Sequence, residues 1–313
     1  MPSSILTLTP NPALDVWTTT ARFRVGPKLR CTAPKIDPGG GGVNVSRVVH
    51  RLGGDTTAIH AAGGRTGEEL AACLDREGVP AERCAIEGAT REDFSVCATE
   101  TGDVLRFVTP GPALRAREIG DLLDRLRDHA ATASLVVGSG SLPDGTGDDF
   151  WAKAAMLCED AGARFVLDSH DRVGPALEAG VFCFRENTDA IAGIAGRDVG
   201  WPEDAADWAE DRVRSGAAEM IVITEGAQGA LLVQRDLRLV LSPPLVEVRS
   251  AIGAGDSFVA GLCLALARGE GPDAALRLAV ATAAATLLTP GTELCRKDDV
   301  DRLVAESNQV RRI

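Results

Sequence analysis

The sequence has no tyrosine and only four lysines among its 313 residues, and it carries no surplus of positive charge. Its formal net charge is −12, with arginine as the main cation. A nucleic-acid surface needs a basic footprint, so this composition argues against nucleic acid as a partner. We therefore expect a phosphorylated ligand, if there is one, to be held by a local cluster of cations.

The chain also lacks any apolar run near the roughly 18 residues that can span a bilayer, and its first residues have no basic region typical of a signal peptide. Its eight cysteines form no C-x-x-C pair. These absences predict free thiols in a cytoplasmic protein with no membrane partner. Cys31, Cys158, Cys183 and Cys263 lie among apolar neighbours in the sequence and are expected to be buried.

Helical and strand patterns alternate through most of the chain, and the strands are apolar and β-branched. This alternation predicts the α/β class: a doubly wound, mostly parallel sheet with helices on both faces. A first strand is expected at 4–9. The clearest later helix–strand pairs are 115–130 with 135–137, 148–160 with 165–167, and 203–215 with 220–224.

Two segments, 15–38 and 94–108, depart from this rhythm because they alternate polar and apolar residues without a helical period. They predict a small β-sheet appended to the main body near a glycine-rich loop. With no repeat or long linker in the sequence, we expect one domain over 1–313.

The motif Gly253-Ala254-Gly255-Asp256-Ser257 directly precedes an apolar helix. Glycines at a helix start allow backbone N–H groups to converge on an anion, and the helix dipole adds positive potential. Asp256 could take a proton from an acceptor hydroxyl. An aspartate N-cap with glycines for close packing is the structural alternative, and the motif alone does not decide between them.

Two other glycine-containing turns are candidate ligand contacts. Gly39, Gly40, Gly41 and Gly42 remove all side chains from one loop before a helix that contains Asn44, which suits close approach to a polar ligand. The turn with Ser141 follows strand 135–137, and ligands of parallel sheets bind beyond the carboxyl ends of strands. The alternative for the four glycines is a flexible turn, and the alternative for the turn with Ser141 is an ordinary turn at the end of a strand.

Four cations lie on or beside the proposed small sheet and could bind a phosphate, although a solvated surface charge is the alternative for each. Asp15 could accept hydrogen bonds from sugar hydroxyls, or could be an ordinary turn residue. The cations are Lys28, Arg30, Arg91 and Arg106.

Together these motifs resemble the ribokinase-like (PfkB) family of carbohydrate kinases, most closely its minor bacterial 6-phosphofructokinase branch. The resemblance extends over nearly the whole chain. The matching stretches are 7–15 (TLTPNPALD), 28–34 (KLRCTAP), 38–44 (PGGGGVN), 62–67 (AGGRTG), 106–111 (RFVTPG), 138–143 (GSGSLP), 226–230 (GAQGA), 253–257 (GAGDS) and 292–295 (TELC).

The resemblance implies a Rossmann-like domain, a β-sheet lid that forms a homodimer interface, and Mg²⁺ with ATP as phosphoryl donor. It implies Asp256 as the base and residues 253–255 as the anion hole. The sugar would be held by Asp15, Gly39–Gly42 and Asn44, and its phosphate by Lys28, Arg91, Arg106 and Ser141. Nucleotide contacts are implied for Asn187, Thr224, Gly226 and Gly229.

One stretch departs from the family pattern. Where the family reads Lys-Pro-Asn-x-x-Glu, this chain reads Arg185-Glu186-Asn187-Thr188-Asp189-Ala190. Asn187 is kept, but alanine stands in the place of the glutamate that helps to organise magnesium. Glu186 and Asp189 are nearby carboxylates that could substitute, with Asn187, through a water molecule.

The sequence therefore predicts ATP-dependent phosphorylation of fructose 6-phosphate at its 1-hydroxyl, which gives fructose 1,6-bisphosphate. Tagatose 6-phosphate and fructose 1-phosphate remain alternative acceptors, since such isomers differ by one or two hydrogen bonds. A sugar-phosphate-binding protein with weak kinase activity is the alternative that Ala190 suggests.

Overall fold

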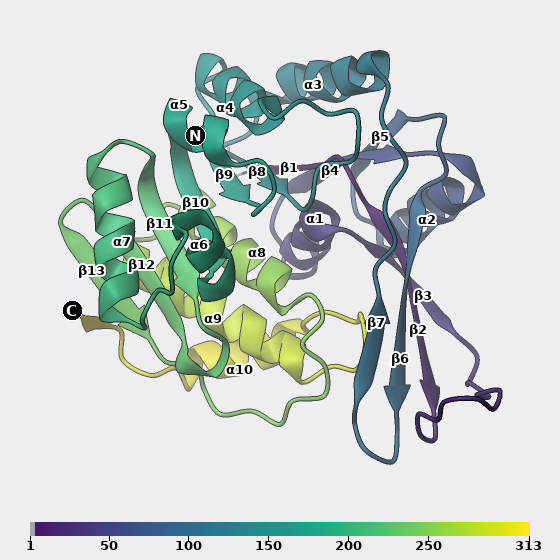
Figure 1. The fold of residues 1–313 in the computed structure, drawn as a ribbon. Helices are drawn as coiled ribbons and strands as arrows, with labels where there is room; N and C mark the ends of the chain where they lie inside the picture. The colour runs from purple at the N-terminus through teal and green to yellow at the C-terminus, as the bar shows by residue number, and fades with distance from the viewer. Residues whose placement is uncertain (1–3) are drawn as a thin grey trace.

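A computed structural model describes residues 4–313, and its main body is built on one ten-stranded sheet (Figure 1). From β5 to β11 every pair of neighbouring strands is parallel, and the last three strands are antiparallel. In spatial order the strands are β5 (Ala81–Ala85), β4 (Thr56–Ala62), β1 (Ile5–Thr9), β8 (Leu135–Ser139), β9 (Arg164–Asp168), β10 (Val181–Asn187), β11 (Ala218–Thr224), β12 (Ala230–Gln234), β13 (Leu237–Leu241) and β14 (Arg311–Arg312).

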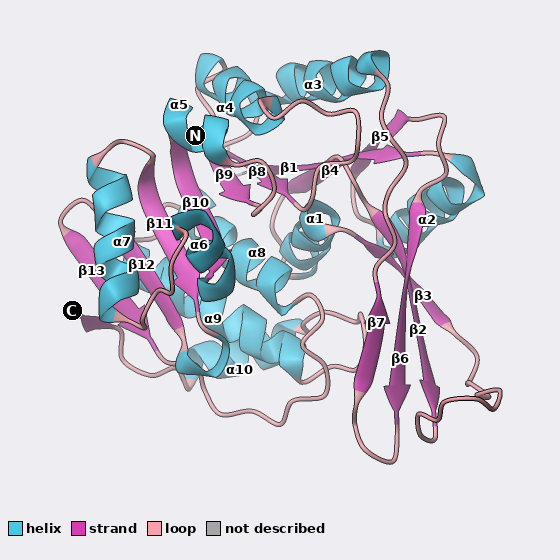
Figure 2. Cartoon of the chain, viewed as in Figure 1, coloured by secondary structure: helices cyan, strands magenta, loops and turns pink. Residues whose placement is uncertain are grey.

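Helices cover both faces of this sheet and bury two large apolar clusters against it (Figure 2). One face carries α3 (Ala116–Ala130), α4 (Phe150–Asp160), α5 (Gly174–Ala179), α6 (Thr188–Ala195) and α7 (Glu203–Arg214). The other carries α1 (Gly41–Arg51), α8 (Ala254–Ala267), α9 (Pro272–Leu287) and α10 (Lys297–Ala305). The doubly wound, mostly parallel sheet is confirmed. The antiparallel hairpin of β12 and β13 was not expected from the helix–strand alternation.

A separate four-stranded sheet projects from the main body (Figures 1 and 2). Its order is β3 (Lys35–Gly39), β2 (Ala13–Thr20), β6 (Arg91–Ala98) and β7 (Val104–Phe107). The prediction of a small appended sheet is confirmed, and residues 21–34 form an exposed connection with no regular strand. Helix α2 (Gly64–Glu77) contacts this sheet and has a small apolar core of its own.

The two faces of the small sheet differ because side chains alternate along each strand. Asp37, Asp15 and Asp93 stand in register across three strands, and all three are buried. The other face carries an apolar row across all four strands: Ile36, Val16, Phe94 and Phe107. The acidic face lies against the main body, and Ile36, Phe94 and Phe107 on the apolar face are exposed.

Within residues 4–313 all eight cysteines are free thiols. Cys158, Cys183 and Cys263 are buried as expected, but Cys31 is exposed, so its predicted burial was wrong. It lies in the open connection between β2 and β3, where no second layer covers it. Over the same described residues, none of the helices has the length and apolar character needed to cross a bilayer.

The strand order places β1 beside β8, although the chain visits β4 and β5 in between. From β1 it winds outward in one direction, and from β8 in the other. Ligands of open α/β sheets bind outside the carboxyl ends of the strands at such a reversal. The glycine loop reaches this point: a Cβ at Gly41 would lie 2.1 Å from Ser139 Oγ at the end of β8.

Candidate active site

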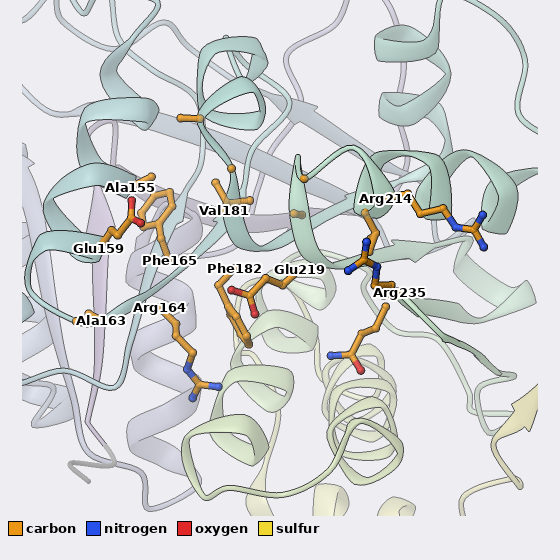
Figure 3. A pocket seen from close by; sticks show the side chains of 17 residues that line it. Ala155, Glu159, Ala163, Arg164, Phe165, Val181, Phe182, Arg214, Glu219 and Arg235 are labelled. Carbon is orange, nitrogen blue, oxygen red and sulfur yellow. The ribbon is translucent and has the colours of Figure 1, made fainter.

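Of two hollows found among residues 4–313, the larger lies at the amino ends of the strands, away from the end where ligands of open α/β sheets bind. It has a volume of about 760 Å³ and lies at the amino ends of β9, β10 and β11. Figure 3 shows its charged side chains, among them Glu159, Arg164 and Arg235, pointing in different directions from separate elements. Because they do not converge on a common point, this groove offers no catalytic arrangement.

The smaller hollow, of about 440 Å³, lies at the carboxyl ends of the strands. Its lining joins Thr224, Gly226 and Gly229, predicted from sequence as nucleotide contacts, to Ala254 and Gly255 of the helix-start motif. The rest of the wall is mainly apolar, with contributions from the 243–248 loop and from α8 and α9. An apolar slot that ends at a helix N-terminus suits a planar base with phosphates at one end.

Asp256 lies in the first turn of α8 and is partly buried. Asn44 Nδ2 of α1 donates a hydrogen bond of 2.8 Å to Asp256 Oδ2. Burial raises the pKa of Asp256 to about 6, and the nearby Asp168 carboxylate adds to the rise. The Asn44 bond and the charges of Arg185 and Arg106 oppose that rise. Asp256 is therefore mostly ionised at neutral pH, with a basicity suited to accepting a proton.

The four glycines between the end of β3 and the first turn of α1 are needed mainly because other groups of the chain lie close to them. A Cβ at Gly39 would lie 2.4 Å from Asp15 Oδ2, and a Cβ at Gly42 would lie 2.5 Å from Thr9 Oγ1. Gly40 adopts a left-handed φ of 105°. The loop is thereby held close to Asp15 and Ser139, which adds a packing reason to the predicted contact with a ligand.

Asp15 faces the glycine loop from β2, and its environment disfavours the charged form. Burial, and after it the adjacent Asp93 carboxylate, raise its pKa to about 7, although Arg106 and Arg47 act in the opposite direction. Its neighbours in the row have cationic partners: Lys35 lies 3.3 Å from Asp37, and Arg91 lies 3.0 Å from Asp93. Asp15 is left as the acceptor that faces the site.

The predicted phosphate-binding cations differ in how tightly the protein holds them. Arg91 is bound to Asp93 and donates to the carbonyls of Thr109 and Asn11. Arg106 is exposed on β7, yet its charge lowers the pKa of both Asp15 and Asp256. Lys28 and Arg30 lie in the exposed connection 21–34, and Ser141 Oγ accepts a hydrogen bond of 3.0 Å from Asn11 Nδ2.

Arg185, at the end of β10, is a site residue that sequence reasoning did not assign. Its guanidinium donates to Asp168 Oδ1 at 3.0 Å and to Thr224 Oγ1 at 2.9 Å. A Cβ at Gly255 would lie 3.2 Å from Arg185 Nη1, so the cation adjoins the helix-start motif. Asp168, whose pKa is raised by burial, was missed as well. The sequence did hold a signal for Arg185 and Asp168, because each is a charged residue at or near the end of an apolar strand.

The altered stretch after β10 has two carboxylates in different surroundings. Glu186 is buried, its Oε2 accepts from the Asn187 N–H at 3.0 Å, and His170 lies 3.7 Å away. The bond to Glu186 raises the pKa of His170. Asn187 Oδ1 caps α6 by accepting from the Ala190 N–H, and Asp189 is exposed. No cluster of three or more metal-binding side chains occurs in residues 4–313.

The fold and the site define a nucleotide-dependent phosphotransferase: a partly buried carboxylate in the first turn of α8 adjoins an apolar pocket at the carboxyl ends of the strands, and Asn44 of α1 donates to it. The chain belongs to the pfkB family of carbohydrate kinases, because the family's model matches residues 12–299.

Named relatives agree with this family. ATP-dependent 6-phosphofructokinase isozyme 2 of Mycobacterium tuberculosis is 40% identical over 98% of this chain and 91% of its own length. The protein of the same name from Escherichia coli is 37% identical over 96% and 98% of the two chains. A 1-phosphofructokinase of Bacillus subtilis is 28% identical over 96% and 98%.

Solved structures give the same result. Phosphofructokinase-2 from Escherichia coli in complex with substrates and products superposes with a TM-score of 0.92 at 36% identity, covering 97% of this chain and 99% of that chain. Arabidopsis thaliana ribokinase, with a TM-score of 0.75 at 18% identity over 97% and 98% of the two chains, shares the fold. The predicted family and fold are thus confirmed.

Proposed function

We propose that this protein transfers the γ-phosphoryl group of ATP to the 1-hydroxyl of fructose 6-phosphate. The observation that carries the proposal is the place of Asp256: it directly follows Ala254 and Gly255 of the 440 Å³ pocket, and it bonds to Asn44 of α1, whose first glycines lie against Asp15 and Ser139. The names of the relatives at 37–40% identity support the choice of acceptor.

In this proposal the enzyme positions two anions and removes one proton. Asp256 takes the proton of the acceptor hydroxyl, and the backbone of residues 253–255 with Arg185 stabilises charge on the transferring group. Asp15, Gly39–Gly42 and Asn44 orient the sugar. Lys28, Arg91, Arg106 and Ser141 hold the phosphate already on the acceptor, and Thr224, Gly226 and Gly229 contact the nucleotide.

Tagatose 6-phosphate and fructose 1-phosphate are the alternative acceptors, the latter supported by the 1-phosphofructokinase relatives. A coupled assay of ADP release over these three sugar phosphates tests the choice. The highest kcat/KM is expected with fructose 6-phosphate, and a higher value with another isomer would contradict the proposal. No turnover with any of them would favour a binding protein. A cytoplasmic location stays a prediction.

Replacement of Asp256 by asparagine is expected to keep the fold and the affinity for the sugar phosphate. It should lower kcat by about 10²–10⁴-fold, the usual contribution of a general base. Rapid-mixing kinetics with a calorimetric measurement of sugar-phosphate binding checks both parts. Turnover of Asp256→Asn within about threefold of wild type would remove Asp256 from the role of base.

Arg106→Ala is expected to raise KM for the sugar phosphate by about tenfold or more, because a charged hydrogen bond contributes about 1.5–3 kcal/mol. KM for ATP should stay nearly constant, and steady-state kinetics in both substrates measures the difference. The matched control is Arg127→Ala, which removes an exposed arginine from α3, a helix that packs against α4 and against β4 and β5 of the main sheet. Equal rises in both KM values would place Arg106 on the donor side or make it structural.

We further propose that Mg²⁺ accompanies ATP and that Glu186 and Asp189, with Asn187, hold it through water in place of the glutamate absent at position 190. When bound, the ion neutralises charge on the nucleotide phosphates. Glu186 and Asp168 lie close enough for the Glu186 charge to raise the pKa of Asp168, so a cation near the end of β10 would relieve their repulsion.

Ala190→Glu is expected to lower the Mg²⁺ concentration that gives half the maximal rate, because it adds a carboxylate to the first turn of α6. The double change Glu186→Ala and Asp189→Ala should raise it. Magnesium titrations of the initial rate at fixed Mg-ATP compare these proteins with wild type. Unchanged curves for both variants would show that these carboxylates do not serve the metal.

We also propose that the apolar row of the small sheet pairs two copies of this chain. Phe94, Phe107 and Ile36 are 42%, 55% and 41% exposed, which is unusual for large apolar side chains in one row. Phe107→Asp should convert a dimer into monomers in sedimentation velocity at micromolar concentration, and the exposed change Arg127→Ala should not. A wild-type monomer would contradict the proposal.

A further inference from the structure

The most deeply buried guanidinium in the region of the site belongs to Arg47 of α1, whose side chain is 1% exposed. Its Nη2 donates to Glu77 Oε1 at 2.6 Å, and its Nε donates to both Glu77 oxygens at 3.0–3.1 Å. Nη1 donates to the Pro38 carbonyl at 2.8 Å and to Asn44 Oδ1 at 3.1 Å. Arg47 is thus fixed on three sides, and its last contact is the amide next to Asp256.

This contact determines which way the Asn44 amide points. A guanidinium only donates hydrogen bonds, so the amide group that faces Arg47 has to be the oxygen. The nitrogen then faces Asp256 Oδ2, at 2.8 Å. In the flipped amide, NH₂ would meet the guanidinium and the oxygen would meet a carboxylate, so both contacts would become repulsive.

We propose that Arg47 is a positioning residue for the base: it holds the Asn44 amide with its nitrogen toward Asp256, and so fixes that carboxylate at the site of proton transfer. The proposal rests on the assignment of Asp256 as base. It gives a part in the reaction to an arginine that lies beneath the glycine loop and belongs to none of the ligand-binding motifs.

The charged groups around Asp256 show why this donor matters. Asp168 on β9 and Asp15 on β2 are negative neighbours, and Arg185 on β10 and Arg106 on β7 are positive ones. The amide of Asn44 is the one side chain recorded as donating directly to Asp256 within residues 4–313.

A donor to a carboxylate favours its charged form, so a weaker donor raises the pKa of Asp256 above its value of about 6. Only the charged form accepts a proton. As the pH is lowered, kcat/KM should therefore begin to fall at a higher pH in such a variant than in wild type.

The test is the pH dependence of kcat/KM for the sugar phosphate in wild type, Asn44→Ala and Arg47→Met. The acid limb should move upward by about one pH unit in Asn44→Ala and by about half a unit or more in Arg47→Met. The double variant should move no further than Asn44→Ala, because in this proposal Arg47 acts on Asp256 only through the Asn44 amide. Titration of the substrate's own phosphate is common to all profiles and cancels in the comparison.

Arg51→Met is the matched control. Arg51 lies on the same helix and also pairs with Glu77, at 3.3 Å, but its other contacts are the carbonyls of Glu293 and Cys295. Loss of Arg51 disturbs the same ion-pair cluster without touching Asn44, so its acid limb should coincide with that of wild type. An equal shift in Arg51→Met would mean that the loss of any arginine from the Glu77 cluster shifts the acid limb, and this would overturn the proposal.

Arg47→Met leaves Glu77 without its main partner, and a protein that does not fold would give no profile. Combining it with Glu77→Gln removes the stranded charge, and Glu77→Gln alone keeps the bond from Arg47 to Asn44. Asn44→Asp gives a second route: it preserves an acceptor for Arg47 but turns an oxygen toward Asp256. We expect a shift of the acid limb larger than in Asn44→Ala.

Two further outcomes overturn the inference: a wild-type profile in Asn44→Asp, or a shift in Asn44→Ala that Arg47→Met, alone or with Glu77→Gln, does not share. Failure of the underlying assignment is separate from both. It would appear as an active Asp256→Asn, whereas failure of the inference leaves Asp256→Asn inactive and the Arg47 profile unchanged.

Discussion

The hydrogen bond between Asn44 and Asp256 joins two helices whose residues are 212 positions apart, and the arrangement of the site depends on it. Helix α1 starts at the glycine loop and α8 starts at the apolar pocket, and the two helices pack against each other in one apolar cluster, so this contact joins them where both reach the site. A carboxylate excluded from water costs free energy unless donors face it. The glycine loop allows α1 to approach closely enough to supply one.

The same constraint explains the unequal treatment of the acids in the small sheet. Asp37 and Asp93 are held by cations, while Asp15 between them is left to face the cleft. Like charges in register across strands are destabilising, and the protein has confined that cost to the one position that a ligand can relieve. The uncompensated carboxyl of Asp15 thus lowers the stability of the folded protein at the place where the ligand binds, and such local costs are common at functional sites.

Much of this could be predicted from the sequence because the signals are local. The helix–strand alternation gave the parallel sheet, and glycines before helices gave both loops of the cleft. The contacts that fix side-chain orientation could not be predicted, because they join distant segments. Arg185 reads as a strand-end residue, and only the fold shows it between Asp168 and Thr224. The predicted burial of Cys31 was wrong because it relied on local signals alone. Apolar neighbours in the sequence do not bury a residue when no second layer covers the loop.

Side chains of the small sheet alternate between its two faces, and this limits the mutations that the sheet can tolerate. Arg106 and Phe107 are adjacent, yet one faces the cleft and the other faces outward. Because side chains in a strand repeat every two residues, inserting or deleting one residue would exchange the two faces along the rest of that strand. Substitutions on one face can therefore accumulate without disturbing the other. Changes of length within these strands would damage both faces at once, whereas the connections at 21–34 and 99–103 lie outside the strands and would leave the alternation intact.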